Sequence, residues 1–335
     1  MRANPIYKRE RTVGSRSIRL PMILTVFNSI LALVALLNMY SMVSQVEVTA
    51  EIQYSAFMEL YTFGAMIVFA MILFIMPALT AGSISGERER QTLDLLLSTQ
   101  VTGLEVAAGK LMASMYNVLL LLISSLPVMA LSFVYGGIGL WDLAFLILSF
   151  LASALFTASI GICFSALCRR TTMATALSYG MLVLFVVGTY TVNQFIWSMA
   201  NMEMTGYANQ IGGIGSQVNS GGFLYLLLLN PAVTFYEIIR GQMGWQETMT
   251  SAAQWFGSRP SNLVLEAWVP VSVILQVALA GLFLAAAVWR LSPGLPRRRR
   301  SGRKRRRVRE SNRSDGCNTI TLSTYDIVQP SKKGD

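Results

Sequence analysis

The sequence contains no histidine and few charged residues. None of the 335 residues is histidine, and Asp, Glu, Lys and Arg together account for only 13% of them. A soluble protein of this length carries roughly twice that fraction of charged residues. The absence of histidine excludes histidine-dependent catalytic triads, histidine metal sites and imidazole proton relays.

A disulfide framework and a phosphate-binding loop are also missing. The three cysteines, Cys163, Cys168 and Cys317, do not form a disulfide pattern, and we expect reduced thiols. The nearest approach to G-x-x-x-x-G-K-[ST] is Gly103–Leu111, where the spacing is one residue too long and leucine replaces the hydroxyl residue. We therefore predict no catalytic residues, no metal and no bound cofactor on this chain.

What the sequence does contain is a series of long apolar runs without charge. Each run exceeds the roughly 20 residues needed to cross a hydrocarbon core of about 30 Å, and helix is the economical state for apolar backbone in lipid. The sequence predicts an all-α membrane protein with six transmembrane helices within residues 20–290. The runs are Leu20–Val46, Leu60–Gly86, Leu111–Trp141, Leu143–Cys168, Thr171–Met202 and Ala267–Trp289.

A further uncharged run, 204–236, is not predicted to cross the membrane. Its first half is rich in glycine, asparagine and glutamine, which makes it too polar for contact with lipid. Only Phe223–Leu229 is apolar throughout, and a helix of that length rises about 10 Å. We expect an outer segment, residues 200–262, that dips into the membrane before span six.

The distribution of Lys and Arg predicts the orientation. With six spans, all but Arg240 and Arg259 of the 27 basic residues fall on the side that carries both termini. Positive residues mark the cytoplasmic side. We therefore expect a multi-pass protein of the cell membrane with both termini in the cytoplasm, whereas a seventh span would place the arginine-rich tail outside.

Both ends of the chain are basic. Residues 1–19 are consistent with a short helix at the inner membrane surface, or with a basic flank that only fixes topology. Residues 291–335 are predicted to be a disordered tail whose arginines attract anionic lipid at about 1 kcal/mol per residue near the surface. Aromatic residues are not interleaved with the arginines, so no nucleic-acid partner is expected.

The cytoplasmic segment 83–104, between spans two and three, has the strongest local pattern. Ser85 is a plausible N-cap, and Glu87 and Glu89 then fall in the first turn, where carboxylates favour the helix dipole. Apolar residues from Leu93 onward follow a three–four spacing and form one stripe. Thr102 and Glu105 fit a capping box that starts the helix entering span three.

This amphipathic helix has two interpretations, a helix at the membrane surface and a docking site for a protein partner. A helix that floats at the lipid headgroups normally carries Lys and Arg on its polar face. Here Glu87, Glu89 and Asp94 balance Arg88 and Arg90. A polar face of mixed sign favours a protein partner over a membrane surface.

The stretch from Ser85 to Lys110 resembles a known family. Its pattern of S-x-E-R-E followed by T-L-D-L-L-L-S-T and ending in G-K is similar to the hallmark of permease subunits of type-2 ABC exporters. A second stretch, Leu229–Gly241, looks like the segment before the last span, where family members place short re-entrant helices on the outer side.

The resemblance implies a coupling helix that docks on a separate nucleotide-binding ATPase subunit, which would hold ATP and Mg²⁺. It also implies a second permease subunit, identical or homologous to this one. The residues predicted to contact the ATPase subunit are Glu87, Arg88, Glu89, Arg90, Thr92, Leu93, Asp94, Leu96 and Leu97.

Uncharged polar residues within the spans are candidates for a translocation path. They are Asn28, Asn117, Asn193, Gln194 and Gln276, and the alternative for each is a hydrogen bond between helices. Because no ionisable residue lies in mid-span, ion binding and proton coupling are disfavoured. Small residues spaced every four positions, Ser153, Thr157, Gly161 and Ser165, indicate a close helix contact within the bundle or between two copies.

These observations predict a permease that exports an amphiphilic, peptide or lipid-linked substrate with energy from a separate ATPase subunit. The alternative is a non-transporting membrane scaffold or immunity protein. That alternative requires no ATPase partner and tolerates loss of the helix Glu87–Leu97.

Overall fold

The computed structural model describes residues 5–15, 18–49, 55–93, 102–136, 139–211, 221–242 and 267–291. This part of the chain is helical apart from short turns and contains no strand, and six of its segments are long and apolar enough to cross a membrane. The predicted all-α, six-span architecture is confirmed. Several predicted features lie outside the described residues. They are Asp94, Leu96 and Leu97, residues 212–220 and 243–262 of the outer segment, and the tail from 292.

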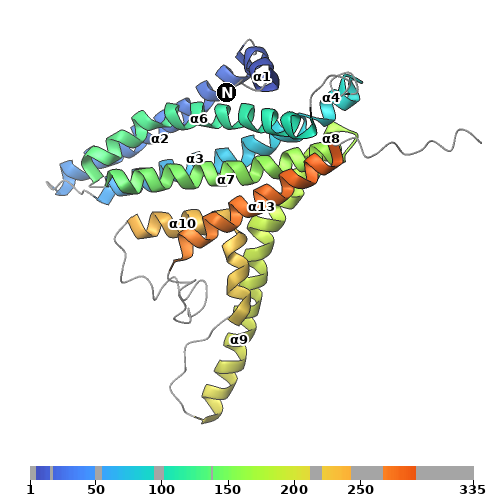
Figure 1. Cartoon of the computed structure of the whole chain (residues 1–335). Coiled ribbons are helices and arrows are strands. Elements are labelled where there is room, and N and C mark those ends of the chain that lie inside the picture. The colour runs from blue at the N-terminus through green and yellow to red at the C-terminus, as the bar shows by residue number, and fades with distance from the viewer. Residues whose placement is uncertain are drawn as a thin grey trace, which may run out of the picture. The chain divides into compact units, whose positions relative to one another are not determined.

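The spans are separate helices, and η2 (Gly221–Leu229) and α10 (Pro231–Gln242) lie between the fifth and the sixth span in the chain (Figure 1). The fifth span is built from two α-helices with one π-helical turn, η1, between them. The spans are α2 (Arg19–Thr49), α3 (Ser55–Ala81), α6 (Gly103–Gly136), α7 (Leu140–Leu167), α8–η1–α9 (Thr171–Val183, Leu184–Gly188, Thr189–Ile211) and α13 (Trp268–Leu291).

Helix α7 is the centre of the bundle, with α3, α6, α8 and α13 packed around it. Its small residues Ser153, Thr157 and Ser165 are buried. At Gly161 an added Cβ would overlap the side chain of Thr80 on α3, so only glycine permits this close approach. The small-residue face therefore serves a contact within the bundle, the first of the two alternatives predicted.

The N-terminal segment forms a helix, α1 (Pro5–Ser15), which packs on the start of α6. Ile6 is buried, and the Arg11 guanidinium lies 5.8 Å from the centroid of the Tyr116 ring. A cation above an aromatic face is attracted by the ring quadrupole. Residues 5–15 are thus attached to the bundle through apolar and cation–π contacts.

The segment before the last span makes a sharp elbow. The 3₁₀ helix η2 (Gly221–Leu229) and α10 (Pro231–Gln242) meet at Asn230 and are bent by 92° relative to one another. Pro231 suits the first position of α10 because the missing N–H would have no helical partner there. The apolar run Phe223–Leu229 falls within η2, which packs against α9 and α13.

Candidate functional site at the α4 corner

The segment after α3 forms a helix of five residues, α4 (Ser85–Glu89). The N-cap position is Ile84, without a side-chain cap, so the prediction of an N-cap at Ser85 is wrong. The Ser85 hydroxyl instead donates to the Ala81 carbonyl at 2.9 Å. Continuity with α3 explains the difference, because Ser85 bonds back to a residue that ends α3.

The expected helix from Ser85 onward is interrupted after one and a half turns. Gln91 has a positive φ of 58°, and the N–H of Thr92 donates to the Glu87 carbonyl at 2.9 Å. The N–H of Gln91 donates to the Arg88 carbonyl at 3.1 Å. Together these two bonds form a Schellman motif, which ends a helix and turns the chain.

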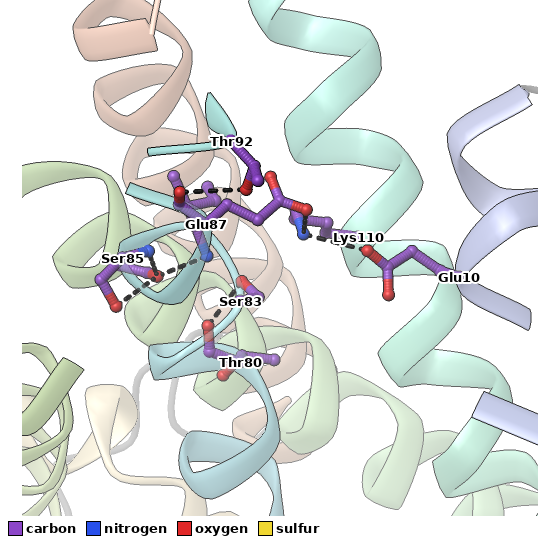
Figure 2. A network of polar contacts seen from close by, with 9 residues as sticks. Glu10, Thr80, Ser83, Ser85, Glu87, Thr92 and Lys110 are labelled. Carbon is purple, nitrogen blue, oxygen red and sulfur yellow. Dashed lines mark hydrogen bonds and ion pairs between the residues drawn. The ribbon is translucent and has the colours of Figure 1, made fainter. Parts of the chain in front are cut away.

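Lys110 at the start of α6 ties α4 to α1. Its Nζ lies 3.0 Å from Glu87 Oε1 and 3.0 Å from Glu10 Oε1, and its side chain is 4% exposed. Figure 2 shows the ammonium group between the two carboxylates. Because a buried charge is costly without partners, these two contacts hold α1, α4 and α6 together.

Arg88 closes the C-terminal end of α7. Its Nη1 donates to the Cys168 carbonyl at 2.7 Å and its Nη2 to the Ala166 carbonyl at 3.0 Å. The last carbonyls of a helix have no helical donor and carry partial negative charge, which a cation stabilises. Arg88 therefore caps the C-terminal end of α7 from α4.

Glu89 caps the N-terminal end of α8, as Arg88 caps the C-terminal end of α7. Its carboxylate accepts the backbone N–H of Thr171 at 2.8 Å and the Thr171 hydroxyl at 3.1 Å. A carboxylate at a helix N-terminus satisfies free N–H donors and the positive end of the dipole. Arg88 and Glu89, which are adjacent in α4, thus bind the C-terminal end of α7 and the N-terminal end of α8.

A serine on α7 binds the first turn of α4. The Ser165 hydroxyl accepts the N–H groups of Ile84 and Ser85, each at 2.9 Å, and all three residues are buried. These N–H groups belong to the first turn of α4, where no helical acceptor is available. We refer to Glu10, Ser165, Lys110 and the α4 residues Ser85, Glu87, Arg88 and Glu89 as the α4 cluster.

The structure divides the predicted contact residues into two groups. Glu87 and Arg88 are half-buried and contact Lys110 of α6 and the C-terminal end of α7. Leu93 is buried, whereas Glu89, Arg90 and Thr92 are exposed. A cleft of about 260 Å³ between α1 and α4 is lined by Arg9, Glu10, Glu87, Arg90 and Thr92. The outward-facing part of this corner is therefore Glu89 to Thr92, together with the rim of the cleft.

The candidates for a translocation path differ in their surroundings. Asn28 makes a local bond to the Leu24 carbonyl, and Asn117 is half-buried. Asn193 is fully buried, and neither its amide nitrogen nor its oxygen has a hydrogen-bond partner among the described residues. Gln194 Oε1 is likewise without a partner there. Gln276 alone joins a larger network.

That network surrounds the elbow. Asn230 Nδ2 donates to the Val186 carbonyl of η1 at 2.8 Å and to Thr189 Oγ1 at 3.0 Å. On the other side, Gln276 Nε2 donates to Thr234 Oγ1 at 2.9 Å. Ser272 contacts Thr234 Oγ1 and donates to the Leu228 carbonyl at 2.6 Å. We refer to Thr189, Asn230, Thr234, Ser272 and Gln276 as the elbow cluster; all five are buried.

Sequence reasoning did not assign a site role to Glu10, Lys110, Ser165 or Asn230. Lys110 has a signal in the sequence, since it is a single charge at the edge of a long apolar run. Asn230 directly precedes Pro231, a pair typical of turns and helix starts. Glu10 and Ser165 have no comparable signal, because their partners are 100 and about 80 residues away.

The fold and the α4 cluster define a multi-pass membrane protein whose short helix α4 bonds directly to α3, α6, α7 and α8. The chain belongs to the ABC-2 family of transporter proteins, since the model of that family, described as ABC-2 family transporter protein, matches residues 5–292. No match was found among curated proteins. The chain is therefore a membrane component of a transporter, and the resemblance inferred from Ser85–Lys110 is confirmed.

Proposed function

We propose that this chain is the permease subunit of an ABC exporter and that a separate ATPase subunit, which binds ATP and Mg²⁺, drives it. The ATPase docks on segment 83–104 from the cytoplasm, where both termini of the permease lie. A second permease subunit completes the membrane part, and the basic tail holds anionic lipid. The cargo belongs to the amphiphilic, peptide or lipid-linked classes.

One observation supports this proposal most strongly: three consecutive residues of α4 each bond to a different helix of the bundle. Glu87 reaches α6 through Lys110, Arg88 reaches α7, and Glu89 reaches α8. A floating surface helix does not require such bonds. A helix that receives force does, because the force has to pass to several spans at once.

The mechanism follows from these contacts. Closure of the ATPase on ATP displaces α4 as a rigid body. Charge-assisted bonds of about 1.5–3 kcal/mol each at the partly buried Glu87 and Arg88, and a weaker one of at most about 1 kcal/mol at the exposed Glu89, then carry α6, α7 and the start of α8 with it. Since α8 continues through η1 into α9, the displacement reaches the elbow. Transmission from α4 to the elbow uses groups of this chain, whereas ATP binding and hydrolysis take place on the partner.

The first experiment is purification of the full chain from its native membrane in detergent. We expect a nucleotide-binding polypeptide to copurify and the complex to hydrolyse ATP. Glu89→Lys places a cation against the N-terminus of α8 while retaining the spans, so transport is expected to fall at least tenfold. ATP hydrolysis continues in this variant, which is the signature of uncoupling.

Two results would contradict the proposal. One is a purified protein without any ATPase partner. The other is full biological function after deletion of Glu87–Leu97, which would support a scaffold or immunity protein instead.

A further inference from the structure

A pocket of about 410 Å³ lies where the fifth span meets the elbow. This volume is within the range of about 300–1,000 Å³ that is usual for small-molecule sites. One wall comes from η1 and the start of α9, and the other comes from the elbow and α10. The lining residues are Val186, Val187, Tyr190, Asn230, Ala232, Val233 and Tyr236.

The chemistry of the lining excludes a charged ligand. No lining residue is ionised at neutral pH, and most of the wall is aliphatic or aromatic. The amide nitrogen of Asn230 already donates to Val186 and Thr189, and its oxygen accepts the N–H of Ala232 at 2.9 Å. With this amide satisfied internally, the pocket favours an apolar group, which gains about 25 cal/mol per Å² of buried surface.

The surroundings of the pocket determine how a ligand reaches it. Residues Val183, Leu184 and Val187 are 55%, 58% and 53% exposed, and they belong to the candidate span Thr171–Glu203. An apolar surface of this kind within a span faces hydrocarbon rather than water. The pocket is therefore open to molecules that dissolve in the bilayer.

The pocket is held in shape by two backbone irregularities. The π turn Leu184–Gly188 widens the helix on one wall, and the 92° bend at Asn230 directs α10 away on the other. Asn230 joins the walls through its bond to the Val186 carbonyl, at the position where the π turn disturbs the regular ladder. A preformed cavity binds a flexible chain at a lower entropic cost than one that has to open.

We propose that this pocket binds the alkyl chain of an amphiphile that enters from the bilayer, and that such amphiphiles are the cargo. The assignment to cargo depends on the proposed export function. The bound chain touches η1 and α10 together, so it occupies the point at which movement of α8 reaches the elbow.

The test uses the complete complex in lipid vesicles and palmitic acid with a diazirine in its chain. We expect labelling of Tyr190 or Tyr236 that saturates and is displaced by unlabelled palmitic acid. Val187→Trp fills the pocket and should reduce this labelling at least tenfold. Val183→Trp adds the same bulk one turn earlier, at equal exposure and outside the lining, and should leave it unchanged. Ala232→Phe provides a second filling variant from the opposite wall.

A second readout addresses the role in transport. Palmitic acid should stimulate ATP hydrolysis of the complex at least twofold, with stimulation retained in Val183→Trp and lost in Val187→Trp. If the ATPase is present and active but the filling variants Val187→Trp and Ala232→Phe behave like the original protein, the pocket proposal fails while the export function stands. If no ATPase copurifies, the export function fails and the assignment to cargo fails with it.

Labelling that does not saturate, or that is equally strong at the exposed Leu36 of α2, would show ordinary contact with bilayer lipid and overturn the proposal. Capture of a second copy of the chain at Tyr190 or Tyr236 would overturn it as well, because protein would then cover the pocket.

Discussion

The α4 cluster and the elbow cluster both join helices through polar groups, but they differ in burial and in chemistry. The first uses an ammonium group, a guanidinium group and three carboxylates. The second uses only hydroxyl and amide groups, with backbone carbonyls as further acceptors. Each cluster connects three or more elements that are distant in sequence.

The different chemistry of the two clusters indicates which of them is stiff and which allows movement. Ionised groups are tolerated only near water or with full pairing, whereas amides and hydroxyls are less costly within hydrocarbon. Hydrogen bonds of neutral groups between membrane helices contribute about 0.6 kcal/mol on average. The α4 cluster is therefore the rigid attachment, and the elbow cluster is the joint that exchanges its bonds more readily.

The largest loss of stability is expected when the α4 cluster loses the ammonium group of Lys110. Lys110→Met leaves Glu10 and Glu87 without their shared partner, and the partial exposure of both carboxylates places the cost at about 2–4 kcal/mol. Thermal unfolding in detergent measures the change. Arg9→Met, an exposed cation on the rim of the same cleft, should have no measurable effect. Equal midpoints for the two variants would contradict the assigned role of Lys110.

The next effect concerns the elbow. Asn230→Ala removes the donors to Val186 and Thr189 and the acceptor for Ala232, with an expected cost of about 1–3 kcal/mol. Asn28→Ala is the control, because that amide makes only a local bond to Leu24. If the elbow variant proves more destabilised than Lys110→Met, the ranking of the two clusters is reversed.

A smaller loss is expected for Ser165→Ala. The substitution leaves the N–H groups of Ile84 and Ser85 buried without an acceptor, at a cost of about 1–2 kcal/mol. Ser124→Ala on α6 removes a local hydroxyl bond to Leu121 and serves as the control. Hydrogen exchange of the two amides should rise in Ser165→Ala only, and unchanged exchange would show that Ser165 does not anchor α4.

The smallest expected change in stability is toward a more stable protein. Asn193→Leu replaces a fully buried amide that has no partner among the described residues, so it should be neutral or stabilise the protein by about 1 kcal/mol. Gln276→Leu should destabilise it, because that amide donates to Thr234. A marked loss of stability in Asn193→Leu would show that Asn193 has a partner, and a loss of transport alone would support its predicted place in the translocation path.

Features that depend on neighbouring residues were predictable from the sequence. The capping box is confirmed by both of its bonds, Thr102 N to Glu105 Oε2 at 2.8 Å and Glu105 N to Thr102 Oγ1 at 3.3 Å. The six spans and the small-residue face around Gly161 follow from composition and helical spacing.

Features that depend on tertiary contact were not predictable. The Schellman turn places Gln91 in the left-handed region, which the sequence does not signal because glycine is the usual residue there. The two carboxylate partners of Lys110 come from different helices, and the π turn Leu184–Gly188 has no local signature. Whether Glu87 to Leu97 contact an ATPase stays a prediction.

The measurement that tests the central claim most directly is photocrosslinking from α4 in native membranes. A photoreactive amino acid replaces Arg90, the exposed residue that ends α4, and a second variant carries it at Leu282 on the exposed face of α13. The account predicts capture of a nucleotide-binding polypeptide from position 90 and of lipid from position 282. Capture of lipid alone at both positions would contradict it.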